Sequence, residues 1–354
     1  TTETWFYRVD IPSDRKHFSK TKPMELKHFE DCITWWNNRE IIPDGEYFKV
    51  QKYTADYLLN EQGCNIDLCG YPHEEEEVLA PADLIQKYEE KRASLNAEID
   101  RTILALSASL NGEPVNFDTQ GTINACGKMD DLHKRFPEDM KKSLLQYAIQ
   151  GKLVEQRPEE GTAEELFARI QEEKQRLIAE KKTKKEKPLP EITEEEKPFD
   201  IPESWKWVYL LDIIEEKPSN GYSPKGVTYP TEIKNLTLTA TTSGRFKDDA
   251  FKYVDISKED ASKYWLKNND LLIQRSNSRE LVGTSCIYTG ADNAYIYPDL
   301  MMRMHVSSQV DIYYIDYVLK APVTRNYYMA SASGTSESMP KINQKIVSFT
   351  LVPL

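Results

Sequence analysis

Two long stretches of the sequence place apolar residues three and four positions apart, which is the spacing of one face of an α-helix. In the stretch that follows Pro81, these residues are Leu84, Tyr88, Leu95, Ile99, Ile103, Leu106 and Leu110. In residues 141–182 they are Leu144, Leu145, Ala148, Ile149, Leu166, Phe167, Ile170, Leu177 and Ile178. A helix with a narrow apolar stripe needs a partner that covers the stripe. We therefore expect these helices to pack against each other, or against a second copy of the chain, as a bundle or coiled coil.

Local signals indicate where these helices begin and end. Pro81 suits the first position of a helix, where the missing N–H of proline costs no hydrogen bond. Thr162 and Glu165 have the spacing of a capping box, so a helix is expected to begin there. Residues 113–140 contain Gly, Pro, Asn and Asp in the proportions of a linker, and we predict a linker at this point.

The character of the sequence changes after residues 186–200. Residues 181–200 contain three prolines and turn from basic to acidic side chains, which is typical of a tether rather than a core. From Trp205 onward, short strand-like runs alternate with clusters of Gly, Asn, Asp and Pro. Strands are predicted at 206–211, 236–241, 270–275, 284–288, 294–297, 301–306 and 347–352, and one helical segment at 311–332.

The beginning of the chain predicts a smaller mixed segment, with a strand at 4–11, a short helix at 24–38, and a strand passing into a short helix at 47–59. The chain begins inside a strand pattern and without Met, so we expect it to be part of a longer polypeptide. The expected fold class is α+β, with long amphipathic helices beside a mostly β domain. The expected divisions are 1–75, a long helix at 76–112, a linker at 113–140, spacer helices at 141–185, a tether at 186–200, and the β domain at 201–354.

Composition excludes several classes of protein. The 354 residues carry a net charge of −12, which argues against indiscriminate binding of nucleic acid. Residues 201–354 carry 17 basic and 17 acidic side chains, so a local basic patch there remains compatible with DNA binding. The five cysteines lack the spacing of a zinc site, and we expect free thiols. No signal peptide and no apolar run of about 20 residues is present, so a soluble, cytoplasmic protein is expected.

The segment LLIQRSNSRELVGTS, residues 271–285, ends an apolar strand in Arg275, Ser276, Asn277 and Ser278. Arginine can bind a guanine edge with two hydrogen bonds, and asparagine can bind an adenine edge in the same way. The alternative is structural, with Arg275 paired to a nearby carboxylate such as Glu280 and Asn277 capping a turn. The residues alone do not separate these two interpretations.

Three further loops combine small polar residues with a cation, which suits contact with phosphates. An ordinary surface turn is the competing interpretation for the first of them, SNGYSPKGV. In the last, GTSESMPKINQK, Met339 and Ile342 are expected to pack inside. The candidate DNA-contacting residues in the three loops are Tyr222, Ser223 and Lys225; Thr241, Thr242 and Arg245; and Thr335, Ser338, Lys341 and Asn343.

Motifs that catalysis would require are missing from the sequence. It contains no Pro-Pro pair, although an adenine methyltransferase needs an Asn/Asp-Pro-Pro-aromatic motif around the flipped base. It contains no Walker A motif, and its five histidines are far apart. We therefore assign no catalytic residue and no metal site to this chain.

The order of three segments resembles the amino-terminal region of the specificity subunit of type I restriction-modification systems. These segments are KKSLLQYAIQGKLVEQ, AEELFARIQEEKQRLI and KPLPEITEEEKPFDIPESWKWVYL, and the R-x-N-x and SMPKIN-like stretches also match. The resemblance covers about residues 129–354. It implies that residues 201–354 form a target recognition domain, which reads one half of a split site in double-stranded DNA.

The first part of the chain, about residues 1–110, resembles the carboxy-terminal tail of the modification methyltransferase subunit of the same systems. The resemblance rests on a WFYR segment, on Asn65-Ile66-Asp67 followed by Tyr71, and on the long helix. Together the two resemblances imply a methyltransferase tail fused to the first half of a specificity subunit. Such a module would dock an adenine-N6 methyltransferase, which would carry the S-adenosylmethionine, and the restriction subunit of the full complex.

This module is either a truncated specificity subunit or a half-subunit that pairs with a second copy. Two alternatives to the module remain open. A different class is an enzyme, a single-chain methyltransferase–specificity fusion whose catalytic domain lies upstream of Thr1. A third is a protein-interaction module without DNA binding.

Overall fold

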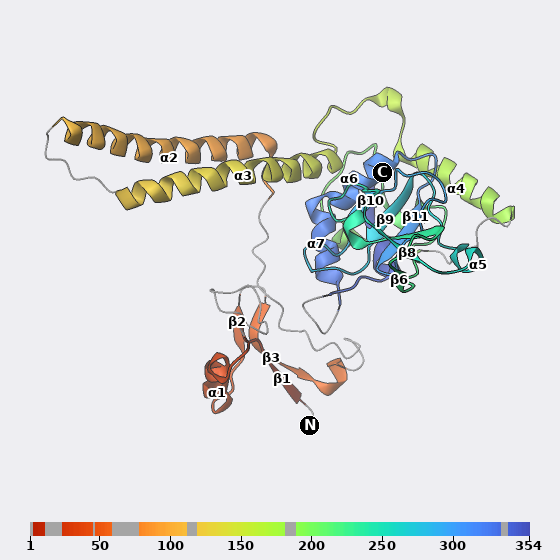
Figure 1. Cartoon of the computed structure of the whole chain (residues 1–354), viewed down its shortest axis with the longest axis horizontal. Helices are drawn as coiled ribbons and strands as arrows, with labels where there is room; N and C mark the ends of the chain where they lie inside the picture. The colour runs from red at the N-terminus through yellow and green to blue at the C-terminus, as the bar shows by residue number, and fades with distance from the viewer. Residues whose placement is uncertain are drawn as a thin grey trace. The chain divides into compact units, whose positions relative to one another are not determined.

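The computed structural model describes residues 3–10, 23–44, 47–58, 78–111, 119–180, 189–333 and 339–354. The chain divides into two compact units, Thr1–Glu77 and Val78–Leu354. Figure 1 shows a small sheet in the first unit, and a helical hairpin and a mostly β domain in the second.

The first unit is a three-stranded antiparallel sheet with one short helix. The strand order is β1 (Glu3–Tyr7), β3 (Tyr47–Thr54), β2 (Ile42–Asp44), and a 3₁₀ turn at Leu26–Phe29 leads into α1 (Glu30–Trp36). Trp35 is buried, with ring centroids 5.5 Å from Trp5 and 5.2 Å from Tyr7, so aromatic packing attaches the helix to the sheet. The predicted strand, helix and strand-to-helix segment are therefore confirmed. Asn65, Ile66, Asp67 and Tyr71 lie outside the described residues.

The second unit begins with a hairpin of two long helices, α2 (Pro81–Leu110) and α3 (Thr119–Ile149), which run antiparallel (Figure 1). Leu95, Ala125 and Leu132 are buried between the helices. The Tyr88 hydroxyl donates to Asp139 Oδ2 at 2.5 Å. The predicted packing of two long helices is confirmed, but the partner of α2 is α3 and not the helix that follows Thr162.

The linker predicted at 113–140 is therefore wrong over its described part. Ala125, Met129, Leu132 and Phe136 recur at helical spacing and face α2, so packing outweighs the local preference of Gly and Pro for a linker. Pro137 lies within α3 although proline costs about 3 kcal/mol in a helix interior.

The apolar seam of α2 is covered only in part. Leu84 and Leu95 are buried, as predicted, whereas Ile103, Leu106 and Leu110 are 54%, 45% and 80% exposed. The last two turns of α2 therefore present apolar side chains to solvent.

The helix after Thr162, α4 (Ala163–Ala179), packs on the β domain. The predicted capping box is present, because Thr162 Oγ1 accepts from Glu165 N and Glu165 Oε2 accepts from Thr162 N, both at 3.4 Å. Ile170 belongs to the domain core, and Lys174 Nζ donates to Leu211 O at 2.5 Å. The sequence predicts that the helices of 141–185 pack against α2, but α4 does not, because its apolar face is covered by the β domain. Residues 141–149 belong to α3.

The described part of the predicted tether, residues 189–200, also packs on the domain. Leu189 and Phe199 contact the main core, and the Phe199 ring lies 4.9 Å from the Trp207 ring. The prediction that this segment lies outside the core is wrong for these two residues, whose apolar surface is covered in spite of the surrounding charges.

Strand β9 (Asp270–Gln274) is the centre of the β domain. It lies in the antiparallel sheet β10 (Ser285–Ile287), β9, β11 (Met301–His305), β5 (Ser219–Asn220), and all five of its residues are buried. Because alternate residues of a strand face opposite sides, Leu271 and Ile273 lie in one core cluster and Leu272 in another.

Two smaller sheets and several short helices complete the domain. The first sheet pairs β12 (Leu351–Pro353) with β4 (Trp207–Tyr209), and the second has the order β6 (Gly226–Val227), β8 (Phe251–Val254), β7 (Ile233–Leu236). The helices are α5 (Lys258–Ala261), α6 (Ile312–Lys320), α7 (Pro322–Ser331) and α8 (Gln344–Ser348).

Most of the predicted strands are confirmed, with four differences. The strand predicted at 206–211 ends at Tyr209, before a 3₁₀ turn at Leu210–Asp212, and the strand predicted at 236–241 is wrong beyond Leu236, because residues 238–240 form another 3₁₀ turn. Residues 344–348 form α8, and the strand predicted at 294–297 is reduced to isolated bridges at Ile296. The predicted helix at 311–332 is divided into α6 and α7, because Ala321, which precedes a proline, adopts an extended conformation with ψ of 147°. The α+β fold class is confirmed.

The described residues contain no helix long and apolar enough to span a membrane, and no group of three or more side chains suited to a metal ion. Cys32, Cys126 and Cys286 are free thiols, and burial raises the pKa of Cys286 to about 12.

The helical hairpin gives a stability prediction. Leu95→Asp should lower the free energy of unfolding by more than about 2 kcal/mol, because it places an unpaired charge in the buried seam. Ile103→Asp is the matched control and should change it by less than about 0.5 kcal/mol, because this side chain already faces water. Urea unfolding followed by circular dichroism measures both. Equal losses in the two variants would contradict the observed packing.

A second prediction concerns pH. His305 Nδ1 lies 3.3 Å from Oδ1 of the buried Asp270, and this hydrogen bond raises the pKa of His305 above its ordinary value of 6.5. A raised pKa in the folded state means that protonation stabilises the fold. The stabilisation is complete below about pH 6.5 and is lost as the pH rises through the folded-state pKa. His305→Gln should therefore lower the Tm more at about pH 5.5 than at about pH 9.

The control for this prediction is His133→Gln, because His133 is exposed on α3. It should show a much smaller pH-dependent difference in Tm. A His305→Gln difference that stays constant from acid to alkaline pH would show that this pair contributes no pH-dependent stability.

Candidate nucleic-acid interface

Three loops meet at one edge of the main sheet. Gln274, at the end of β9, pairs with Met301 at the start of β11, and Asn220, at the end of β5, pairs with Met302. Because these strands are antiparallel, the loops that follow β9 and β5 and the loop that precedes β11 lie at the same edge. This edge carries residues from two of the four predicted segments.

The backbone holds Arg275 and Ser276 firmly at this edge. Their amides donate to Leu300 O at 2.8 and 3.3 Å, and Ile342 N donates to Arg275 O at 3.0 Å. Ser276 also forms a bridge with Lys341, so the structure brings together two predicted segments that are far apart in the sequence. Ser276 itself is buried, and its hydroxyl has no hydrogen-bond partner among the described residues.

The side chain of Asn277 faces the protein rather than solvent. Its Nδ2 donates to Gln274 Oε1 at 2.7 Å, and its Oδ1 accepts from Ser278 N at 2.8 Å. This geometry favours the structural interpretation for Asn277. For Arg275 it does not, because no ion pair with Glu280 or another carboxylate occurs in the part of the chain that the structure describes.

The 240–245 loop is connected to the same edge through Gln274. The Gln274 Nε2 lies within hydrogen-bond distance of Leu238 O, Thr241 Oγ1 and Thr242 Oγ1, at 2.9, 2.9 and 3.0 Å. The two threonine hydroxyls are thus directed inward, and Thr241 is buried. Arg245 is exposed at the tip of this loop.

The 221–225 loop presents an aromatic ring and a cation. Tyr222 is 41% exposed and stacks on Tyr264 with ring centroids 5.5 Å apart. Ser223 is occupied by a hydrogen bond to the Asp299 carboxylate. Lys225 is exposed.

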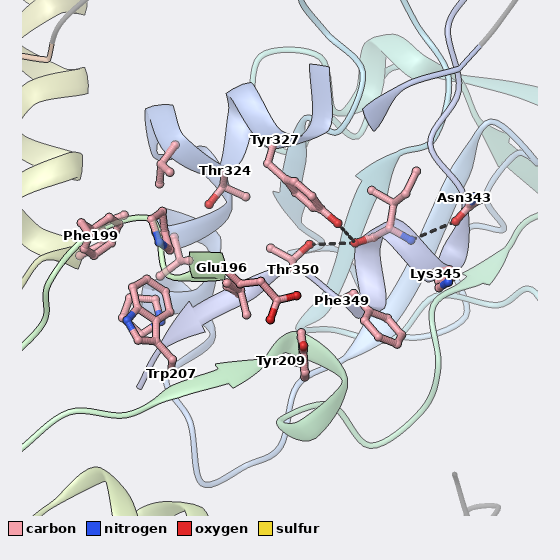
Figure 2. A pocket seen from close by; sticks show the side chains of 17 residues that line it. Glu196, Phe199, Trp207, Tyr209, Thr324, Tyr327, Asn343, Lys345, Phe349 and Thr350 are labelled. Atoms are coloured by element: carbon pink, nitrogen blue, oxygen red, sulfur yellow. Dashed lines mark hydrogen bonds between the residues drawn. The ribbon is translucent and has the colours of Figure 1, made fainter. Parts of the chain in front are cut away.

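In the fourth segment, Thr335 and Ser338 lie outside the described residues. Lys341 is exposed, and its backbone exchanges two hydrogen bonds with Ser333. Ile342 is buried as predicted, whereas Met339 is 42% exposed and is not packed inside. Asn343 caps α8, because its Oδ1 accepts from Ile346 N at 2.9 Å (Figure 2).

A cavity of about 490 Å³ lies beside α8 (Figure 2). Its walls are mostly aromatic and aliphatic, and Glu196, Lys345 and the hydroxyls of Thr324 and Thr350 contribute polar groups. The aromatic lining residues are Phe199, Trp207, Tyr209, Tyr327 and Phe349. Such walls suit an apolar group rather than a phosphate, so we do not include this cavity in the candidate interface.

The candidate interface is therefore defined by four cations on the joined loops, with Tyr222 beside them. Among the described residues, none of these cations has a carboxylate partner. The cations are Lys225, Arg245, Arg275 and Lys341. Sequence reasoning missed Gln274, whose only signal is a polar side chain directly after the apolar run Leu271–Ile273.

Comparison with known proteins identifies relatives of part of the chain. No protein-family model matches. The chain is 34% identical over 211 residues to the specificity subunit of the type I restriction enzyme EcoEI of Escherichia coli, and 32% identical over 222 residues to that of EcoAI. The chain has type I restriction specificity subunits as homologues.

The matched residues make up 58% and 61% of this chain but only 35% and 36% of the two specificity subunits. The chain thus spans about a third of the length of the curated relatives that it matches. A further match, 29% identical over 115 residues, is to the methylase subunit of EcoEI and covers 32% of this chain and 23% of that subunit.

Two solved structures of type I systems are also similar to the chain. One, described as showing complex assembly and conformational transition of the type I R-M system, is 13% identical over 72% of this chain and 56% of its own, with a TM-score of 0.33. The other is the HsdS subunit of Thermoanaerobacter tengcongensis, 13% identical over 64% of this chain and 46% of its own, with a TM-score of 0.32.

The resemblance to specificity subunits that the sequence predicts is thus confirmed. The fusion of a methyltransferase tail to a specificity-subunit half stays a prediction, because the match to the methylase subunit is partial.

Proposed function

We propose that residues 201–354 are a target recognition domain that binds double-stranded DNA and reads one half of a bipartite site in a type I restriction-modification complex. The observation that carries this proposal is the set of cations without carboxylate partners on loops that hydrogen bonds connect at one sheet edge. The similarity to specificity subunits supports the same conclusion. Loops on a rigid sheet are suited to recognition because the sheet fixes their ends.

The cations have different parts in this proposal. Arg275 contacts a base edge, because its planar guanidinium can make two parallel hydrogen bonds to guanine and its backbone is held at both N and O. Lys225 and Lys341 contact phosphates, because an ammonium is a point charge without a preferred plane. Arg245 joins them at the tip of its loop. Ser276, Asn277 and Thr241 support the loops from inside.

The remaining parts of the chain serve assembly in this proposal. The second unit's α2–α3 hairpin and the first unit dock an adenine-N6 methyltransferase subunit or domain, which carries the S-adenosylmethionine, and the complete complex adds the restriction subunit. The exposed apolar side chains of α2, such as Leu104 and Leu110, would be covered in such an assembly or by a second copy of the chain.

A second candidate function is that of the carboxy-terminal part of a methyltransferase–specificity fusion enzyme with its catalytic domain upstream of Thr1. The match to a methylase subunit favours it. An Asn-Pro-Pro-Phe-like motif encoded upstream in the same gene would support the fusion. A separate methyltransferase gene would support the subunit.

The first test is selection of a preferred site from random DNA duplexes, followed by binding to single-base variants at two salt concentrations. Arg275→Ala should reduce the free energy of binding to the cognate site by about 1–3 kcal/mol and relax the sequence preference at one base pair. Lys341→Ala should weaken all duplexes about equally and reduce the salt dependence, because a phosphate contact is lost. Arg176→Ala, on the exposed face of α4, is the control. If Arg275→Ala keeps both affinity and preference, Arg275 is structural and this assignment is wrong.

A second test concerns catalysis. The chain alone should bind no S-adenosylmethionine and methylate no DNA, because the motifs for the cofactor and for the flipped base are missing from its sequence. Calorimetric titration with S-adenosylmethionine should show no saturable heat. A saturable isotherm would reveal a cofactor site within these residues.

A further inference from the structure

Gln274 is a polar residue in a place where the neighbouring sequence is apolar. It ends β9 after Leu271, Leu272 and Ile273, and it is fully buried. A buried amide without partners is costly, so its hydrogen bonds determine whether the position can hold it. The side-chain hydrogen bonds of Gln274 go to loops and not to the sheet.

The two ends of the Gln274 carboxamide bind two different loops. Its Nε2 lies 2.9 Å from Leu238 O, 2.9 Å from Thr241 Oγ1 and 3.0 Å from Thr242 Oγ1. Its Oε1 accepts from Asn277 Nδ2 at 2.7 Å. The 238–242 loop precedes Arg245, and Asn277 follows Arg275 by two residues.

Asn277 extends the connection by one further step. Its Oδ1 accepts from Ser278 N at 2.8 Å, so the backbone turn after Arg275 is joined to the buried amide. Because a carboxamide is planar, a rotation that improves the contacts at one end would break those at the other end. The two loops are therefore restrained relative to each other.

We propose that Gln274 is a positioning residue for sequence recognition, which holds the 238–242 and 275–278 loops in the one arrangement that presents Arg275 to a base edge. The inference rests on the proposed function and adds a residue that itself touches no DNA. A buried polar network whose hydrogen bonds are satisfied makes a structure rigid and restricts it to one arrangement. Base readout depends on such restriction, because bidentate hydrogen bonds require a fixed guanidinium plane. Phosphate contacts tolerate small displacements.

The test separates specificity from affinity and from stability. Gln274→Met keeps an unbranched side chain of similar length but removes both ends of the amide. The full chain with this substitution should remain folded and keep the salt dependence of binding. Its preference for the selected site over single-base variants should fall by about tenfold or more, because one well-formed base contact carries discrimination of that size.

Two further variants examine each end of the amide while Gln274 stays in place. Thr242→Val removes one acceptor of Nε2, and Asn277→Ala removes the donor to Oε1. Both should lower the same sequence preference. When either substitution is combined with Gln274→Met, the preference should fall by less than the product of the two separate reductions, because all three residues act through one network. These variants keep the proposal testable if Gln274→Met does not fold.

The matched control is Tyr328→Phe, which removes a different buried hydrogen bond, the one of 2.8 Å to Thr350 Oγ1. It should lower the Tm and leave the sequence preference unchanged. A folded Gln274→Met variant that retains the wild-type sequence preference, or that binds every duplex equally more weakly, overturns this inference but not the proposed function. A wild-type chain that shows no sequence preference overturns the proposed function as well.

Discussion

The burial of both faces of β9 is the constraint on which the carboxy-terminal domain depends. Leu271 and Ile273 pack on one side with Ile149 of α3, Ile170 of α4 and the side chains of α6 and α7. Leu272 packs on the other side with a cluster rich in tyrosine. A shift of one residue in the register of this strand would turn each side chain to the opposite face and disrupt both cores. The position of Arg275, at the end of this strand, is fixed for the same reason.

The same packing changes the role of the helices before the domain. The sequence of residues 141–182 predicts spacer helices that pack against the helix after Pro81 or against a second copy of the chain, because their apolar stripe is narrow and their other face is charged. The structure places the end of α3, the helix α4 and Leu189 and Phe199 in the main core of the domain. The packing of these segments thus contributes to the stability of the domain, and they are not a flexible connection. The α2–α3 hairpin, by contrast, buries a small core of its own.

Local patterns were sufficient to predict the elements but not their partners. The capping box at Thr162, the helix after Pro81 and most strands depend on residues close in sequence, and these predictions are confirmed. The linker prediction at 113–140 is wrong because it gives weight to Pro137 and the glycines and not to the helical spacing of the 125–136 seam, which packs against α2. Partner choice is a tertiary property that periodicity does not contain.

The same distinction applies to the candidate interface. The residue types at 275–278 and at 341 predict DNA contacts for each segment separately, and the structure joins the two segments through the hydrogen bond from Ile342 N to Arg275 O and the bridge between Ser276 and Lys341. Which side chains face outward was not predictable, because it depends on bonds across the fold. Asn277 and Thr241 have the chemistry of base or phosphate contacts, but their side chains form hydrogen bonds with Gln274. Asn343 has the same chemistry, but its Oδ1 accepts a hydrogen bond from Ile346 N.

Charge and hydrogen bonding make separate contributions to the proposed recognition. A chain with a net charge of −12 is not attracted to DNA as a whole, and residues 201–354 carry equal numbers of basic and acidic groups. Affinity must then come from a few local cations, whose effect is screened within about 10 Å at ordinary salt. So few phosphate contacts provide little binding to unrelated sequences. In the proposed recognition, discrimination between sequences therefore depends on how rigidly Arg275 is held. The buried run Leu271–Ile273 and the buried amide of Gln274 restrain the loop that carries Arg275, and neither of them is charged.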